Sequence, residues 1–105
     1  MFSFLKNILG GGTTTPLTAD VLRKGTILDV RTPGEYAGGH VAGAKNIPLQ
    51  TLGQSMAKVQ KMPQPIVTCC ASGRRSGMAA KQLRSQGIEA INGGSWQQVN
   101  RLKQS

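Results

Sequence analysis

The chain has 105 residues, a length typical of one domain, and 38% of them are hydrophobic, which is enough for one modest core. The formal net charge is +9 because 13 lysines and arginines outnumber four acidic residues, and this charge favours either a solvated basic surface or anionic partners. Scattered basic residues and few aromatic ones argue against nucleic-acid binding, and no stretch approaches the ~20 apolar residues of a stable membrane span.

The N-terminal segment is predicted to lie outside the folded domain. Apolar residues at positions 2, 5, 8 and 9 suit a short amphipathic helix, and the Gly- and Thr-rich run 10–16 suits a flexible linker. The segment lacks the charged start and long apolar region of a secretory signal. It either covers part of the domain or docks weakly on a membrane surface or a partner. We therefore divide the chain into an N-terminal segment, 1–16, and a domain, 17–105.

Short strands alternate with helices through the rest of the chain. Capping residues and apolar spacing predict helices over 18–24, 32–37, 49–59 and 76–86, and a terminal helix after Ser95. Thr32 and Glu35 form a predicted capping box with Pro33 at the first helical position. Buried strands are predicted over 26–30, 44–48, 65–69 and 88–91. This order predicts a small α/β domain with a mostly parallel sheet and helices on both faces.

Two adjacent cysteines end one of these strands. Neighbouring side chains on a strand point to opposite faces, so Cys69 is predicted to lie in the core and Cys70 at the mouth of the following loop. The residues that would surround the Cys70 sulfur are Ala71, Ser72, Gly73, Arg74, Arg75 and Ser76. Adjacent cysteines do not make a disulfide framework, and no Cys/His cluster suggests a metal. We expect reduced thiols, a reducing and hence cytoplasmic location, and no metal or other cofactor.

The loop after Cys70 has the composition of an anion-binding loop. Small residues allow successive backbone N–H groups to face a bound anion, and the helix predicted to start near Ser76 adds its positive end. Arg74 and Arg75 add charge, and one of the two would steer an anionic substrate. Together these groups should lower the pKa of Cys70 from about 8.5 toward neutrality and make the thiolate a nucleophile.

The position of the second arginine limits which anion would be bound. A cysteine phosphatase requires an arginine at the sixth position after its cysteine, where the guanidinium clamps phosphate. In this chain Ser76 occupies that position, and Arg75 comes one residue early. The shorter loop suits a persulfide sulfur and argues against phosphatase or arsenate reductase chemistry.

Four ordered motifs resemble the rhodanese family of single-domain sulfurtransferases, and the resemblance covers residues 17–103. The matching pieces are Asp29-Val30-Arg31 with Glu35-Tyr36, Gly39-His40-Val41-Ala42-Gly43-Ala44 with Asn46-Ile47-Pro48, the loop 70–76, and Gly93-Gly94 with Trp96. The resemblance implies a three-layer α/β sandwich around a five-stranded, mostly parallel sheet.

The resemblance also implies a function and a set of roles. Cys70 would form a persulfide from thiosulfate or another sulfane-sulfur donor and pass the sulfur to cyanide or to a thiol, including a protein thiol. Residues 71–76 would hold the sulfur. At the edge of the site, Asp29 and Arg31 are expected to form a structural ion pair, with Glu35 as a capping carboxylate and His40 as a hydrogen-bonded turn residue. The alternative left open is that the fold serves as a binding or sensing module without turnover.

Overall fold

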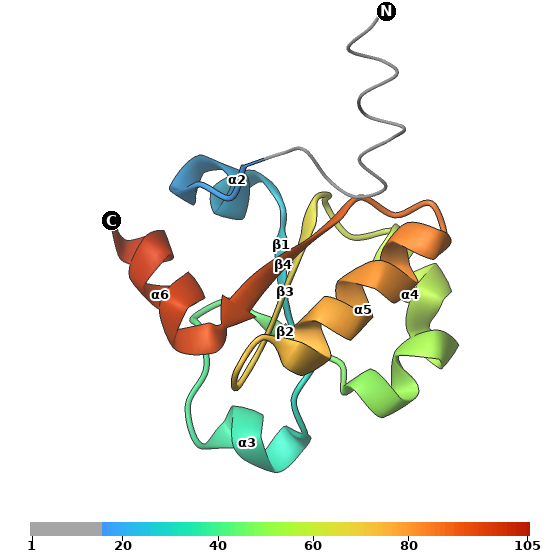
Figure 1. Ribbon diagram of the computed structural model, residues 1–105, viewed down its shortest axis with the longest axis horizontal. Coiled ribbons are helices and arrows are strands. Elements are labelled where there is room, and N and C mark those ends of the chain that lie inside the picture. The colour runs from blue at the N-terminus through green and yellow to red at the C-terminus, as the bar shows by residue number, and fades with distance from the viewer. Residues whose placement is uncertain (1–15) are drawn as a thin grey trace, which may run out of the picture.

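The computed structural model describes residues 16–105, which form a parallel sheet covered by helices on both faces (Figure 1). The sheet has the strand order β2-β1-β3-β4, in which every neighbouring pair is parallel. The strands are β1 (Thr26–Asp29), β2 (Lys45–Asn46), β3 (Ile66–Cys70) and β4 (Ala90–Ser95). The helices are α2 (Ala19–Lys24), α3 (Pro33–Ala37), the 3-10 helix η1 (Leu49–Ser55), α4 (Met56–Gln60), α5 (Arg74–Ser85) and α6 (Trp96–Gln104).

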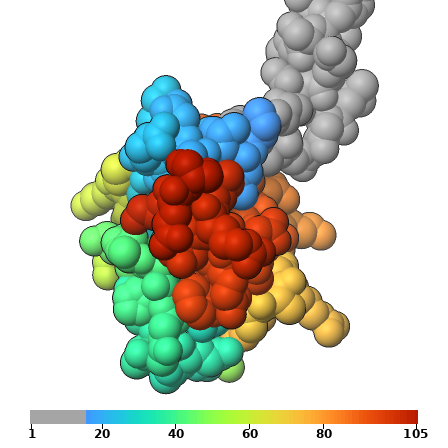
Figure 2. Space-filling model, turned by 90° about the vertical axis from the view of Figure 1, so that its left-hand side faces the viewer, coloured from blue at the N-terminus to red at the C-terminus, as the bar shows by residue number. Residues whose placement is uncertain are grey.

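Alternating side chains along the strands build a separate hydrophobic core on each face of the sheet. In β1, Leu28 belongs to the core that includes residues of η1, α4 and α5, whereas Ile27 belongs to the core that includes residues of α2 and α6. Figure 2 shows α2 and α6 packed side by side on the second face. The predicted α/β sandwich with helices on both faces is therefore confirmed.

The described residues contain four strands, whereas the family resemblance implied five. The same four segments had been predicted from the residues themselves. Within residues 16–105, the segments between these four strands are helices, turns or loops. The predicted N-terminal helix and nearly all of the linker lie outside the described residues.

Several helices begin directly after residues whose side chains cap the helix N-terminus. Thr18 accepts a hydrogen bond from the backbone of Val21, and Thr32 and Glu35 form the predicted reciprocal capping box at the start of α3. Ser95 caps α6 by accepting from the backbone N–H of Gln98 at 3.2 Å. These caps are satisfied by residues within one helical turn.

Several boundaries differ from the sequence prediction: the strands shift or shorten by one to two residues at most ends, and three differences are larger or bear on the site. The helix predicted over 49–59 is divided into η1 and α4, and α5 begins at Arg74, two residues before the predicted start. β4 continues to Ser95, although the glycine pair predicted a turn. A Cβ on Gly93 would lie 2.7 Å from Val99 Cγ2 and 2.8 Å from Val67 Cγ1. Gly93 is thus needed because α6 and β3 approach this strand too closely for a side chain.

Candidate active site

The parallel sheet brings the predicted site residues to one edge. Cys70 is the last residue of β3, and β1 ends beside it with Asp29 in register with Cys69. Because the carboxyl ends of parallel strands share an edge, Asp29, Arg31 and the loop after Cys70 lie at the same end of the sheet (Figure 1).

The Cys70 sulfur lies within a ring of donors from its own loop. The backbone N–H groups of Gly73 and Ser76 donate to Sγ at 3.0 and 3.3 Å, and the thiol lies 3.4 Å from the Ser76 hydroxyl. Gly73 has a φ of +101°, and a Cβ there would lie 3.3 Å from the Cα of Gly94. Glycine therefore permits the left-handed turn that aims these N–H groups at the sulfur.

The two adjacent thiols have opposite electrostatic surroundings. Burial raises the pKa of Cys70, but hydrogen bonds from the Ser76 side chain and from the backbone of Ser76, Gly73 and Ser72 outweigh it and leave the pKa below its ordinary value. Burial and the nearby Asp29 raise the pKa of Cys69 to about 12. Both residues are completely buried, in different cores. Cys70 is thus the thiol suited to ionise.

The two arginines of the loop have different surroundings. Arg75 makes a two-pronged ion pair with Glu35, in which Nη1 donates to Oε1 at 2.8 Å and Nη2 to Oε2 at 3.0 Å. The pair joins α5 to α3, and hydrogen bonds from Arg75 and from the backbone of Thr32 lower the pKa of Glu35 to about 2. Arg74 is exposed and forms no ion pair with any residue in 16–105. Of the two arginines, Arg74 is thus the more exposed and Arg75 the one held by an ion pair.

A buried ion pair holds the edge of the site. Arg31 Nη2 donates to Asp29 Oδ2 at 2.7 Å and Arg31 Nε to Asp29 Oδ1 at 2.9 Å. The same guanidinium donates to the carbonyl of Gly39 and lies 5.0 Å from the ring centroid of Trp96. Asp29 contacts no part of the Cys70 loop in these hydrogen bonds, so the pair braces the segment after β1.

His40 lies apart from the sulfur. Its Nδ1 is 2.7 Å from the carbonyl oxygen of Tyr36, and the two rings stack with their centroids 3.7 Å apart. Tyr36 in turn donates from its hydroxyl to the carbonyl of Ala44 at 2.5 Å. The histidine is therefore part of the turn after α3 and has no contact with Cys70 among these interactions.

Sequence reasoning missed Asn92, which lies in β4 beside the loop. The Ser76 hydroxyl donates to Asn92 Oδ1 at 2.7 Å, and Asn92 Nδ2 donates to the carbonyl of Gly73 at 3.2 Å. The only signal in the sequence is a polar residue directly before the glycine pair, and it does not reveal that β4 lies next to the loop. Asn92 contacts both residues that donate to the sulfur.

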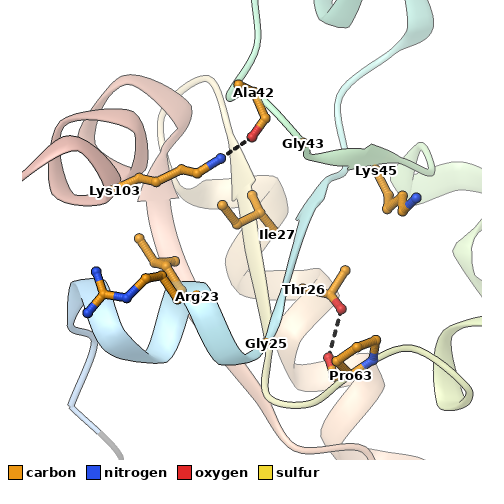
Figure 3. A pocket seen from close by; sticks show the side chains of 10 residues that line it. Arg23, Gly25, Thr26, Ile27, Ala42, Gly43, Lys45, Pro63 and Lys103 are labelled. Atoms are coloured by element: carbon orange, nitrogen blue, oxygen red, sulfur yellow. Dashed lines mark hydrogen bonds between the residues drawn. The ribbon is translucent and has the colours of Figure 1, made fainter.

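A separate cavity of about 440 Å³ lies beside the amino end of β1 (Figure 3). Three cationic side chains, Arg23, Lys45 and Lys103, are among the residues that line it. Figure 3 shows Arg23 and Lys45 pointing away from each other, and Lys103 donates to the carbonyl of Ala42. Because these cations do not converge, the cavity does not form a second anion site.

Within residues 16–105, no group of three His, Cys, Asp or Glu side chains is arranged to hold a metal ion. In the same part of the chain, no helix has the length and apolar character needed to cross a membrane.

Comparison with known proteins identifies the family. Residues 14–100 match the profile of the Rhodanese-like domain family. The chain belongs to this family. Its rhodanese-like fold is similar to that of a rhodanese-related protein from Thermoplasma volcanium, with a TM-score of 0.69 and 26% identity over 81% of this chain and 88% of that one. The family resemblance predicted from the four motifs is therefore confirmed.

The rhodanese-like chain is also similar in sequence to two curated relatives. It is 42% identical over 69 residues to the uncharacterized protein YqhL of Bacillus subtilis, covering 66% of this chain and 54% of YqhL. It is 35% identical over 65 residues to the thiosulfate sulfurtransferase PspE of Escherichia coli, covering 61% of this chain and 62% of PspE. The matched region thus spans about half to two thirds of these relatives.

Proposed function

We propose that this rhodanese-like chain is a sulfurtransferase in which Cys70 carries the transferred sulfur. The observation that carries the proposal is the pair of backbone N–H groups, from Gly73 and Ser76, that donate to Cys70 Sγ at 3.0 and 3.3 Å. Such donors stabilise a thiolate, and they would equally stabilise negative charge on a sulfur bonded to it. The name of the relative PspE supports the same reaction class.

The proposed reaction has two displacements at sulfur. The Cys70 thiolate attacks the outer sulfur of thiosulfate, forms an S–S bond and releases sulfite with the electron pair of the broken bond. The resulting persulfide anion lies within reach of the loop donors. Cyanide or an acceptor thiolate then attacks the outer sulfur, forming thiocyanate or a new persulfide and returning Cys70 as the thiolate.

The other site residues would attract the sulfur donor or hold the Cys70 loop in place. Arg74 is exposed at the start of α5, where it would attract an anionic donor. The backbone of 71–76 would hold the sulfur. Arg75 and Glu35 fix the loop against α3, and the Asp29–Arg31 pair braces the opposite side. No general base is required, because the sulfur is already favoured as an anion.

The functional unit is proposed to be the domain 17–105, with the segment 1–16 as a tether. The cytoplasmic location stays a prediction, as do the absence of a cofactor and of a nucleic-acid partner. The donor and acceptor above are the proposed classes, an anionic sulfane-sulfur compound and a small or protein-borne nucleophile.

The experiment measures thiocyanate formation from thiosulfate and cyanide, together with the intact mass of the protein after incubation with thiosulfate alone. We expect turnover and the addition of one sulfur atom on Cys70. Cys70→Ala should lose both signals, while Cys69→Ala, the matched control one residue away, should keep them. Equal thiocyanate from wild type and Cys70→Ala, with no added sulfur from any sulfane donor tried, would show that the proposal is wrong and would favour a binding module.

A further inference from the structure

A hydrogen-bond chain leads from Cys70 to Asn92 through a single hydroxyl. The Cys70 thiol lies 3.4 Å from Ser76 Oγ, and Ser76 Oγ lies 2.7 Å from Asn92 Oδ1. Ser76 is completely buried, so water does not compete for its hydroxyl. The hydroxyl has one proton to donate. In the neutral state the thiol donates to Ser76 Oγ, and Ser76 donates its own proton to Asn92.

Two backbone groups fix which end of the Asn92 amide faces Ser76. The N–H of Gly94 is 3.0 Å from Oδ1 and can only donate, so this atom must be the oxygen. The carbonyl of Gly73 is 3.2 Å from the other amide atom and can only accept, so that atom must be the nitrogen. Asn92 therefore presents an acceptor to the Ser76 hydroxyl and cannot donate to it in this orientation.

Ionisation of Cys70 changes what the hydroxyl must do. Once the thiol proton has left for solvent, Sγ becomes a strong acceptor, and the Ser76 proton can stabilise it only by leaving Asn92. Asn92 Oδ1 then still accepts from the Gly94 N–H but no longer from Ser76. Asn92 Oδ1, 2.7 Å from Ser76 Oγ, and the thiolate therefore compete for one proton, and the Gly94 carbonyl oxygen, at 3.4 Å, is a more distant third acceptor.

From this competition we infer that Asn92 is a positioning residue that sets the pH at which Cys70 ionises, by holding the Ser76 proton away from the sulfur in the thiol state. The inference rests on the proposed role of Cys70 as the nucleophile, and it adds a residue outside the loop to the control of that nucleophile. Asn92 thus favours the thiol, whereas Ser76 and the loop N–H groups favour the thiolate.

Few charged groups face the sulfur from the surrounding elements. They are Arg74 and Arg75 on α5, Glu35 on α3, the Asp29–Arg31 pair that begins at the end of β1, and the neighbouring Cys69, whose pKa is raised to about 12. Neither η1 nor β4 carries a titratable side chain. Asp29 pairs with Arg31, Glu35 pairs with Arg75, and Arg74 faces solvent, so replacing Asn92 by alanine removes no partner of these charges.

The loop retains support when the Asn92 side chain is removed. The carbonyl of Gly73, which accepts from Asn92, also accepts from the N–H of Gly77 at 3.0 Å. Gly73 is the N-cap of α5 and Ser76 lies in its first turn, so the helix also holds both donors in place. Asn92→Ala should therefore act mainly on the Ser76 proton.

The test measures the pH midpoint of Cys70 alkylation in the full chain, by mass spectrometry, with Cys69 replaced by alanine throughout. Asn92→Ala should lower the midpoint by about 0.4–1 pH unit, the size expected for one net hydrogen bond. Asn92→Asp should raise it, because the carboxylate accepts from Ser76 more strongly and places negative charge near the sulfur. A general loss of structure would not be expected to shift the alkylation midpoint in opposite directions in Asn92→Ala and Asn92→Asp.

A double-mutant cycle shows whether the effect passes through Ser76. Ser76→Ala should raise the midpoint, and in that background Asn92→Ala should no longer shift it. Asn46→Ala is the matched control, because Asn46, like Asn92, hydrogen-bonds two backbone groups at this edge, but its partners are the carbonyls of Asp29 and Arg31 and not Ser76. An unchanged or raised midpoint in Asn92→Ala would overturn the inference. So would an equal lowering by Asn92→Ala in the Ser76→Ala background, or an equal lowering in Asn46→Ala. Alkylation needs no sulfur donor, so these outcomes stand apart from success or failure of sulfur transfer.

Discussion

At the scale of single residues, Cys69 and Cys70 have different surroundings because neighbouring side chains on a strand point to opposite faces of the sheet. The Cys69 thiol is buried in the core with residues of α2 and α6, and no hydrogen bond from residues 16–105 to its sulfur offsets the loss of water. The Cys70 thiol is equally buried but receives donors from its own loop. The two thiols therefore differ because burial and Asp29 raise the pKa of Cys69, whereas hydrogen bonds from the loop lower the pKa of Cys70.

Alkylation of the native protein at pH 7–8 should modify Cys70 alone. The pKa of Cys69, raised to about 12, leaves almost no thiolate there, and Cys70 should react more slowly than a free thiolate because it is buried. Peptide mapping after brief iodoacetamide treatment checks this, with urea-unfolded protein as the control in which both cysteines react. Equal labelling of the two in the folded state would contradict the assignment.

The ion pair between Glu35 and Arg75 makes stability depend on pH in the acidic range. The folded pKa of Glu35 is about 2, lowered mainly by Arg75, against an ordinary value of 4.5. A depressed carboxyl pKa contributes stability that is fully present above the unfolded value and is lost as pH falls through the folded value. Wild type should thus lose more stability than Glu35→Gln between about pH 5 and pH 2. Urea unfolding across this range measures it, and parallel pH profiles would contradict it.

At the scale of elements, the start of α5 decides the geometry of the site. Gly73 ends the loop in a left-handed conformation, and the helix then begins at Arg74. The sequence predicted a later start because no Ser, Thr, Asp or Asn cap precedes Arg74 at the usual place. As a result Arg75 and Ser76 lie in the first helical turn, which directs Arg75 to Glu35 and the Ser76 N–H to the sulfur.

Replacing Gly73 by alanine should affect both stability and Cys70, whereas the same change at Gly87 should affect stability alone. Both glycines have positive φ, +101° and +80°, so each change costs about 1–2 kcal/mol of strain. Only at Gly73 would the new Cβ contact a site backbone, at 3.3 Å from Gly94 Cα, while Gly87 has open space. Thermal unfolding and the pH midpoint of alkylation separate the effects. An unchanged Cys70 midpoint in Gly73→Ala would contradict this role of the loop turn.

Element prediction succeeded where the signal is local. The capping box of Thr32 and Glu35 and the helix start after Thr18 depend on residues three positions apart, so the sequence contains the whole interaction. It failed at β4, where the Gly93-Gly94 pair suggested a turn. That strand continues because it pairs with β3 as far as Ser95, which lies in register with Cys70. Glycine fits at position 93 because Val67 of β3 and Val99 of α6 leave no room there for a side chain.

At the scale of the whole molecule, two cores hold one sheet from opposite sides. Leu28 lies at the centre of β1, is fully buried, and packs in the core beneath α5 that also contains Cys70. Met78, on the outer side of α5, is 58% exposed. The fold should thus tolerate change at Met78 and be sensitive at Leu28.

Leu28→Ala should lower the free energy of unfolding by about 2–5 kcal/mol, through lost burial and a residual cavity. Met78→Ala, the control for loss of a large apolar side chain, should change it by less than about 0.5 kcal/mol. Urea denaturation of both variants measures the difference. Equal losses would mean that the outer face of α5 is covered or that the core beneath it is not continuous.

The sequence by itself determined the order of strands and helices, the division between Cys69 and Cys70, and the family, because periodicity, capping and ordered motifs are local properties of the chain. Only the tertiary structure decided the partners of the loop. It paired Arg75 with Glu35, 40 residues earlier, and left Arg74 exposed. It also placed Asn92, 16 residues after Ser76, against the hydroxyl that faces the sulfur. Such contacts depend on which strands lie side by side and on the path of each loop. Neither can be read from the spacing of residues along the chain.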